Sequence, residues 1–264
     1  MRKLYLLLLL SLVQVAAQAQ SKVTAPTAIW PEWQISHGVG ESGVLFLQNQ
    51  FRINSDERYN DLKESGLLNN FERVQLTLGY EHAFTDHWRA GAFFRYALED
   101  MPKTGFTTAY LRHTGSIKSL FFTKQVMFEY VTQERRDAYG RFRLMGELGR
   151  RLTVGAKFLT PVLSYELFLN KQFGQATADL EERTIDRTRL RLSLTYELTE
   201  KLRLSPYFMR QTDYYFVQVA PKYDEHEVLV EDGYTTKRNR ISPVIGLGVK
   251  YTWSGAPAVG SYTY

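Results

Sequence analysis

Apolar and polar residues alternate along the stretch from Arg187 to Leu198, RTRLRLSLTYEL. Every second position from Leu190 to Leu198 is Leu or Tyr, whereas the positions between carry arginine, serine, threonine and glutamate. Successive side chains of a β-strand point to opposite faces, so the pattern predicts a strand with one apolar face and one polar face.

The same alternation recurs roughly ten times, and little apolar sequence is left over to build a separate core. An alternating chain of this kind can satisfy its backbone in lipid by closing into a barrel with apolar side chains outward and polar side chains inward. We therefore predict an all-β fold, a transmembrane antiparallel β-barrel of about 10 strands (10 to 12). The predicted strands are 44–54, 71–82, 88–98, 107–114, 120–133, 140–152, 154–170, 187–198, 202–214 and 240–253.

Two segments leave the strand number open. The segment 29–37 contains Trp30, Pro31 and Trp33 and fits an extra edge strand or a docked arm. A tail of residues 254–264 follows the last predicted strand. Within 154–170 the alternation changes phase around Thr160 and Pro161, which predicts a β-bulge there.

Connection lengths give an independent prediction of orientation. Starting from the strand 44–54, long connections such as 55–70 and 215–237 alternate with short turns such as 84–87. In barrels of the outer membrane the long loops are extracellular and the short turns periplasmic. We expect this orientation, with a recognition strand for the barrel-assembly machinery at 240–253.

The N-terminus predicts export. Arg2 and Lys3 precede an apolar run from Leu4 to Val13, and Ala17-Gln18-Ala19 forms a small-residue cleavage site. The predicted organisation is a signal peptide at 1–19, a leader and possible extra strand at 20–43, a barrel at 44–253 and a tail at 254–264. The expected location is the cell outer membrane.

Composition changes this picture little. A mean hydropathy of -0.32 and 23% charged residues suit a barrel, because its apolar outer face and polar inner face cancel in the average. The 14% of aromatic residues suit girdles at the two membrane interfaces. The chain has no cysteine, which excludes disulfides and thiolate metal sites. Without Arg2 and Lys3 the chain is only mildly basic, so we expect no nucleic-acid partner.

Short motifs recur through the chain at Trp33, Arg52, Glu129 to Gln133, Arg141-Phe142-Arg143, Glu166 to Asn170 and Asp186-Arg187. Together they resemble a family of outer-membrane β-barrels of the Bacteroidota type that is defined by a domain of unknown function. The resemblance implies a barrel and no activity, since none is assigned to the family. One departure is Met145, where the pattern usually has an acid; Glu147 lies two positions later on the same face.

The predicted inner face is strongly charged and contains more arginine than acid. One interpretation is a pore constriction that favours anions, because rings of basic side chains select anions. The other is a narrow barrel filled by interlocked arginine–carboxylate pairs. The candidate lumen-lining residues are Arg52, Arg73, Glu81, Arg89, Arg95, Glu129, Arg141, Arg143, Glu147, Glu166, Arg187, Arg189, Arg191, Glu197 and Arg203.

Enzymatic alternatives have weak support. A lipid hydrolase of this class needs a histidine and a serine together on one face, and no predicted strand has that spacing. His113 lies near Ser116, but beside a turn expected on the periplasmic side. We therefore predict no catalytic residues and no enzyme, with an outer-membrane lipid-modifying enzyme as the alternative.

The longest loop offers surface chemistry. Its acidic run from Asp224 to Glu227 could bind a divalent cation, although acidic loops are usually only solvated. Its tyrosines and basic residues could contact lipopolysaccharide, which makes a surface ligand-binding barrel a further alternative. We expect no metal, no cofactor, a monomer, and outer-membrane lipid and lipopolysaccharide as partners.

Overall fold

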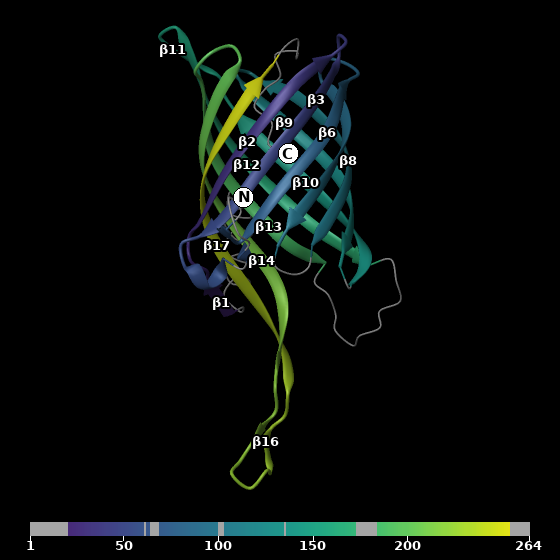
Figure 1. Cartoon of the computed structure of the whole chain (residues 1–264), viewed down its shortest axis with the longest axis vertical. Helices are drawn as coiled ribbons and strands as arrows, with labels where there is room; N and C mark the ends of the chain where they lie inside the picture. The colour runs from purple at the N-terminus through teal and green to yellow at the C-terminus, as the bar shows by residue number, and fades with distance from the viewer. Residues whose placement is uncertain are drawn as a thin grey trace, which may run out of the picture.

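A computed structural model describes residues 21–60, 62–63, 69–99, 103–134, 136–172 and 184–253. The predicted signal peptide and the tail 254–264 lie outside these ranges. The main sheet has 13 strands, of which β1 and β11 pair along one side only, and the other 11 form a closed wall (Figure 1).

The wall follows chain order. Its strands are β2 (Ala28–Val39), β3 (Gly43–Asn54), β6 (Arg73–Ala83), β7 (Trp88–Leu98), β8 (Thr104–Ile117), β9 (Leu120–Gln133), β10 (Arg136–Gly149), β12 (Lys157–Gln172), β13 (Ile185–Glu197), β14 (Leu202–Val219) and β17 (Tyr234–Thr252). The short elements are β1 (Ser21–Thr24), η1 (Glu57–Tyr59), β4 (Leu62–Lys63), β5 (Asn69–Phe71), β11 (Leu152–Val154), β15 (Lys222–Tyr223) and β16 (Leu229–Glu231).

The barrel closes through a parallel seam between its first and last strands. Ala28–Ser36 of β2 pairs in parallel with Val244–Thr252 of β17, whereas all other wall neighbours are antiparallel. The segment around Trp30 is therefore a full strand, which raises the expected core of ten strands to eleven. Pro31 fits because the β2–β3 register skips from Ile29 to Glu32, where proline has no N–H to donate.

The two ends of the barrel differ, as the connection lengths predict. The short-turn end carries the connections 40–42, 84–87, 118–119, 150–156 and 198–201. The long-loop end carries the connections 55–72, 99–103, 134–135, 173–184 and 220–233, three of which are the longest of the wall. The paired extensions of β14 and β17 at this end project well beyond the wall (Figure 1). Because the strand number is odd, β2 starts at the long-loop end and β17 finishes at the short-turn end.

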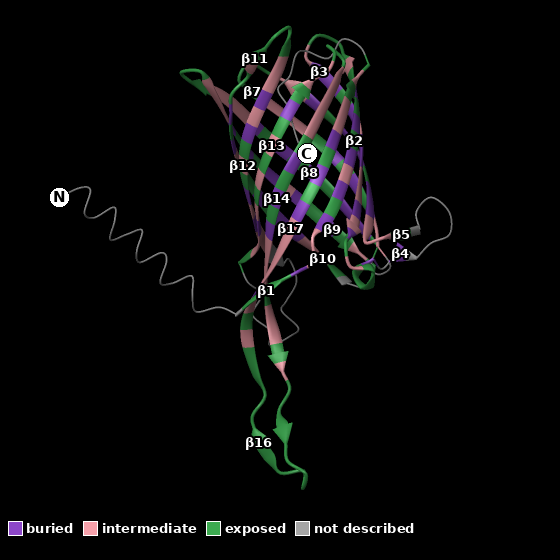
Figure 2. Ribbon diagram, turned by 90° about the vertical axis from the view of Figure 1, so that its left-hand side faces the viewer, coloured by how far each residue is buried: buried purple, intermediate pink, exposed green. Residues whose placement is uncertain are grey.

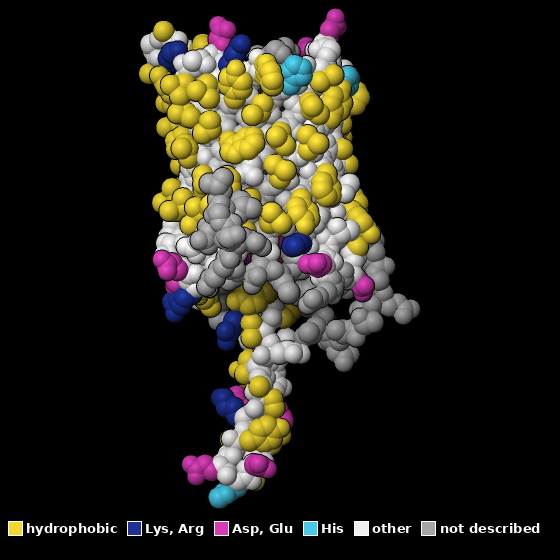
Figure 3. All heavy atoms as spheres, viewed as in Figure 1, with side chains coloured by type: hydrophobic (Ala, Val, Ile, Leu, Met, Phe, Trp, Pro, Cys, Tyr) yellow, Lys and Arg dark blue, Asp and Glu magenta, His cyan; other side chains and the backbone are white. Residues whose placement is uncertain are grey.

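Buried and exposed side chains alternate along the wall strands (Figure 2). On the face of the molecule seen in Figure 3, hydrophobic side chains are spread over the wall, and charged ones gather at its two ends and on the hairpin. Leu192, for example, is 57% exposed between its outward neighbours Leu163 and Phe208. This belt is the surface expected against hydrocarbon. In the described residues, no helix is long and apolar enough to cross a membrane.

The interior is packed in several places by large side chains. One cluster joins Phe46, Phe93, Tyr110 and Met127, and another joins Trp30, Tyr207, Met209 and Val244. A small barrel is filled by its inward side chains in this way.

The predicted bulge is misplaced. β12 pairs with β13 continuously through Thr160 and Pro161, and the register shifts between Phe168 and Leu169 instead. The phase change in the sequence arises because residues 152–154 belong to the separate strand β11, which turns back onto the start of β12.

Candidate functional site

Glu129 of β9 is buried inside the barrel with 0% exposure. Arg141, its register partner on β10, donates from Nε at 2.7 Å, and Arg143 donates from Nη1 at 2.7 Å. Arg95 of β7 completes the set with a further ion pair to Glu129. One fully dehydrated carboxylate thus holds three guanidinium groups.

Arg143 connects Glu129 to a second carboxylate. Its Nε donates to Glu166 Oε1 at 2.7 Å, and Arg189 approaches the other oxygen of Glu166 at 3.5 Å. We call Arg95, Glu129, Arg141, Arg143, Glu166 and Arg189 the central network.

Phe168 of β12 lies inside the central network and is 1% exposed. The guanidinium carbons of Arg141, Arg143 and Arg189 lie 5.1, 4.8 and 4.9 Å from its ring centre. Cations over a ring face are attracted by its quadrupole. The ring therefore fills the space between the guanidinium groups and holds them apart.

A second group lies closer to the short-turn end around Glu81 of β6, which is 1% exposed. Arg112 Nη1 and Tyr110 Oη each donate to Glu81 Oε2 at 2.8 Å, and Arg89 reaches Oε1 at 3.3 Å. Arg112 also donates from Nε to Gln125 at 2.7 Å. These contacts join side chains of four neighbouring strands, β6 to β9.

The predicted residues nearest the long-loop end form separate contacts. Arg187 pairs with Asp213, and Arg73 pairs with Glu99. Arg52 donates to Gln50 at 3.2 Å and lies 4.0 Å above the ring centre of Trp30. At the opposite end, Glu197 pairs with the half-exposed Arg151 at 2.8 Å.

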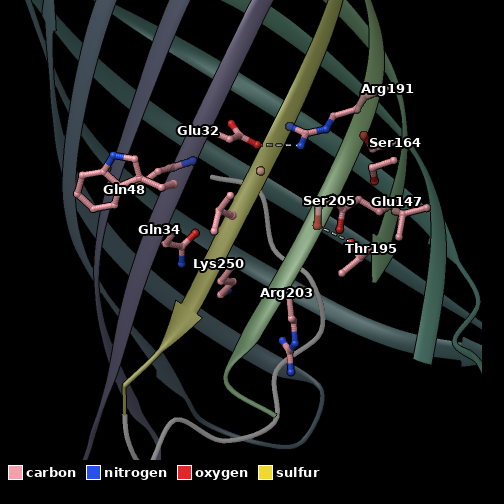
Figure 4. A pocket seen from close by; sticks show the side chains of 15 residues that line it. Glu32, Gln34, Gln48, Glu147, Ser164, Arg191, Thr195, Arg203, Ser205 and Lys250 are labelled. Carbon is pink, nitrogen blue, oxygen red and sulfur yellow. Dashed lines mark hydrogen bonds and ion pairs between the residues drawn. The ribbon is translucent and has the colours of Figure 1, made fainter. Parts of the chain in front are cut away.

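A pocket occupies the lumen between the central network and the short-turn end (Figure 4). Its open space is about 620 Å³, solvent at its mouth included. Glu147, Arg191 and Arg203 line it, and Arg191 pairs with Glu32 of β2 at 2.9 Å. The predicted lumen residues thus form several local groups at different heights and not one ring.

A family model for a protein of unknown function, DUF2490, matches residues 27–218. The chain belongs to this family. The resemblance seen in the sequence is thereby confirmed, and the matched region runs from β2 through β14, so it includes the central network.

No curated protein matches this DUF2490 chain. Among solved structures, the chain is similar to one of the NanC porin, with 12% sequence identity and a TM-score of 0.44. That similarity covers 86% of this chain and 99% of the other.

Three interior residues of this DUF2490 member were absent from the predicted set. Arg112 is 0% exposed, Glu32 is 7% exposed, and Lys250 lines the pocket. The alternation of β8 and β17 places Arg112 and Lys250 inward, so both could have been predicted from the sequence as lumen-lining residues. The inward position of Glu32 could not be predicted in this way, because the sequence left open whether the segment around Trp30 is a strand.

The residues considered for catalysis and for metal binding lie away from the central network of the DUF2490 barrel. His113 packs edge-on against Trp88, with ring centres 4.7 Å apart, near the short-turn end. In the acidic loop, Asp224 accepts the backbone N–H groups of His226 and Val228 at 2.8 Å each. Across the residues that the structure describes, no group of three or more His, Cys, Asp or Glu side chains is arranged to hold a metal.

Proposed function

We propose that the protein is a non-enzymatic barrel of the outer membrane whose lumen is closed by side chains and does not conduct as an open pore. The observation that carries the proposal is the burial of Glu129 by Arg95, Arg141 and Arg143. The export signal, the alternating strands and the apolar belt support the outer membrane as its location.

The central network argues against the anion-pore interpretation. An anion attracted by arginines needs guanidinium groups that are free to exchange partners, and here each arginine of the central network is already in an ion pair with Glu129 or Glu166. Breaking a buried pair leaves an uncompensated charge, which costs about 3–5 kcal/mol. A passing anion would have to meet that free-energy cost at each arginine whose ion pair it breaks. The ring of Phe168 also occupies the same space.

Single-channel recording tests the proposal. Refolded protein in a planar bilayer should show no discrete conductance steps, while its compact, heat-resistant mobility on gels shows that the barrel is folded. Discrete anion-biased steps that fall in Arg143→Gln or Arg189→Gln would show that the lumen conducts and would overturn the proposal.

A second candidate function rests on the projecting hairpin. Tyr223, Val228, Val230 and Tyr234 are 61%, 59%, 67% and 51% exposed there. Such apolar exposure, next to Lys222 and Lys237, suits contact with lipopolysaccharide at the cell surface.

Shortening the hairpin tests this candidate. Val219 and Tyr234 are register partners, so an Asn-Gly turn can replace residues 220–233 without disturbing the wall. The shortened barrel should lose capture of lipopolysaccharide vesicles; equal capture by both proteins would remove the candidate.

A further inference from the structure

The outer surface of β13, β14 and β17 changes character toward the long-loop end. Leu192, Phe208 and Ile245 form one row across these strands and are 57%, 52% and 55% exposed. The next row toward the long loops contains Arg210, whose register partner on β17 is Pro243. Counted from the short turns, Arg210 is the first charged outward side chain of these three described strands. The apolar belt therefore reaches its limit here.

The outward face of β14 stays polar for two further rows. Thr212 and then Tyr214 follow Arg210 at every second position. Tyr214 Oη and Thr188 Oγ1 share a 3.3 Å hydrogen bond. Tyrosine rings concentrate at the level of the lipid headgroups. We therefore expect the surface of the lipid leaflet close to the row of Tyr214.

Two lysines lie at and beyond this level. Lys22 of β1 is the register partner of Asn239, which pairs in turn with Tyr214. Figure 2 shows β1 at the base of the projecting hairpin. Lys237 lies two positions from Asn239 on β17 and therefore on the same face, with its Nζ 5.8 Å from the centre of the Phe216 ring.

Arg210, Lys22 and Lys237, which we call the rim cations, are all exposed. Among the residues that the structure describes, none of their charged groups has an ion-pair or hydrogen-bond partner. The acids nearest in register do not meet them, because Asp213 pairs inward with Arg187 and Asp186 lies outside the paired rows of β13 and β14. The rim cations can therefore bind an external anion.

The arrangement of the rim cations favours a lipid with more than one phosphate. Lys22 and Lys237 belong to adjacent rows, about 7 Å apart along the strands, whereas Arg210 lies about 13 Å from the row of Lys22. The apolar row of Phe208 and Ile245 adjoins Arg210 on the other side. Lipid A, the membrane anchor of lipopolysaccharide, carries a phosphate at each end of a disaccharide and acyl chains beneath it. A free phosphate ion would leave the apolar row unused.

We propose that this surface binds lipid A. Its acyl chains lie against the row of Phe208 and Ile245, and its phosphates lie at Arg210 and at the pair Lys22 and Lys237. The inference rests on the proposed outer-membrane location and names the part of lipopolysaccharide that is recognised. It needs none of the residues 220–233, on which the hairpin candidate depends.

Native mass spectrometry of the refolded barrel in detergent tests the inference with three matched probes. These are lipid A with two phosphates, with one phosphate and with none. Each Lys or Arg near an anionic lipid surface strengthens binding about fivefold. The form with two phosphates should therefore bind roughly fivefold tighter than the form with one, and the form with none should bind weakest.

Variants of the rim cations assign the contacts. Arg210→Gln should weaken binding of the form with two phosphates about fivefold, and Arg210→Lys, which keeps the charge, should restore most of it. The double variant Lys22→Gln and Lys237→Gln should weaken it further. Lys124→Gln is the matched control, because Lys124 is an exposed outward cation of β9 near the short-turn end. It should bind like the unchanged protein.

Two results in protein with folded gel mobility would overturn the inference. One is equal affinity for the three forms of lipid A. The other is binding of phosphatidylglycerol as tight as that of lipid A with two phosphates, which would make the surface a general contact for anionic lipid. Neither result depends on the conductance recording. Hairpin shortening leaves all three rim cations in place, so the shortened barrel should bind lipid A like the unchanged protein.

Discussion

Glu32 of β2 and Arg191 of β13 form a 2.9 Å ion pair inside the lumen, although 159 residues separate them in the chain. In the wall, β14 and β17 lie between these two strands. The pair therefore spans the inner side of the parallel seam and ties the first strand to the C-terminal half of the barrel.

Loss of this pair should weaken closure of the barrel. Glu32→Gln leaves the Arg191 charge buried without its partner, which should lower the free energy of unfolding by about 3–5 kcal/mol. Urea unfolding in lipid vesicles measures the change. Glu197→Gln removes an ion pair whose arginine side chain is 54% exposed, so it should cost at most about 1 kcal/mol. Equal losses in the two variants would contradict a special role for Glu32.

Phe168 is the side chain whose removal should open the lumen. Phe168→Ala removes the ring between the guanidinium groups, so we expect small anion-biased conductance steps together with a loss of about 3–5 kcal/mol in stability. Planar-bilayer recording gives the first readout. Leu167→Ala, at the adjacent position on the other face, is the control and should stay silent. A folded Phe168→Ala protein without steps would place the barrier outside the central network.

The outer face should reject charge in proportion to its depth in lipid. Leu192→Arg, in the middle of β13, should lower the free energy of unfolding by about 2–4 kcal/mol. Tyr223→Arg, which is equally exposed but lies on the projecting hairpin, should change it by less than about 0.5 kcal/mol. Similar effects at both positions would show that the wall around Leu192 does not face hydrocarbon.

Protease treatment of intact cells tests the orientation. Trypsin should cut the hairpin at Lys222 or Lys237 and should spare Lys118 and Lys201, which lie at the short turns. Mass spectrometry of the fragments reads the cleavage sites. Cleavage at Lys118 and Lys201 with an intact hairpin would mean that the short-turn end faces outward.

Gly246 is required where the last strands pack at the seam. A Cβ at Gly246 would lie 2.1 Å from Cζ of Tyr207, whose hydroxyl donates to the backbone oxygen of Trp30 at 3.1 Å. Gly246→Ala should therefore cost about 1–3 kcal/mol through overpacking. At Gly146 the nearest atom to such a Cβ is 3.9 Å away, so Gly146→Ala should be tolerated. Urea unfolding of both variants measures the difference, and equal free energies of unfolding would contradict a close contact at Gly246.

The sequence alone predicted the class of fold and most of its strands. The alternation from Leu190 to Tyr196 reappears as outward side chains of β13, and the positions between them, Arg191, Ser193 and Thr195, line the lumen. This works because lipid on one side and a polar interior on the other impose a period of two on every strand. The connection lengths also predicted that the short turns lie together at one end of the barrel, as they do in the structure.

Only the tertiary structure decided how the barrel closes and which charges meet. Alternation assigns a side chain to a face, but neither its height nor its partner across the lumen follows from it. Glu32 and Arg191 meet because strand tilt and the parallel seam bring β2 and β13 to the same level. Glu129 likewise collects three arginines from two strands, while Glu147 on the same inner face is left without a donor among the described residues. Closing the sheet sets these distances, since register and curvature are properties of the whole wall and not of any one strand.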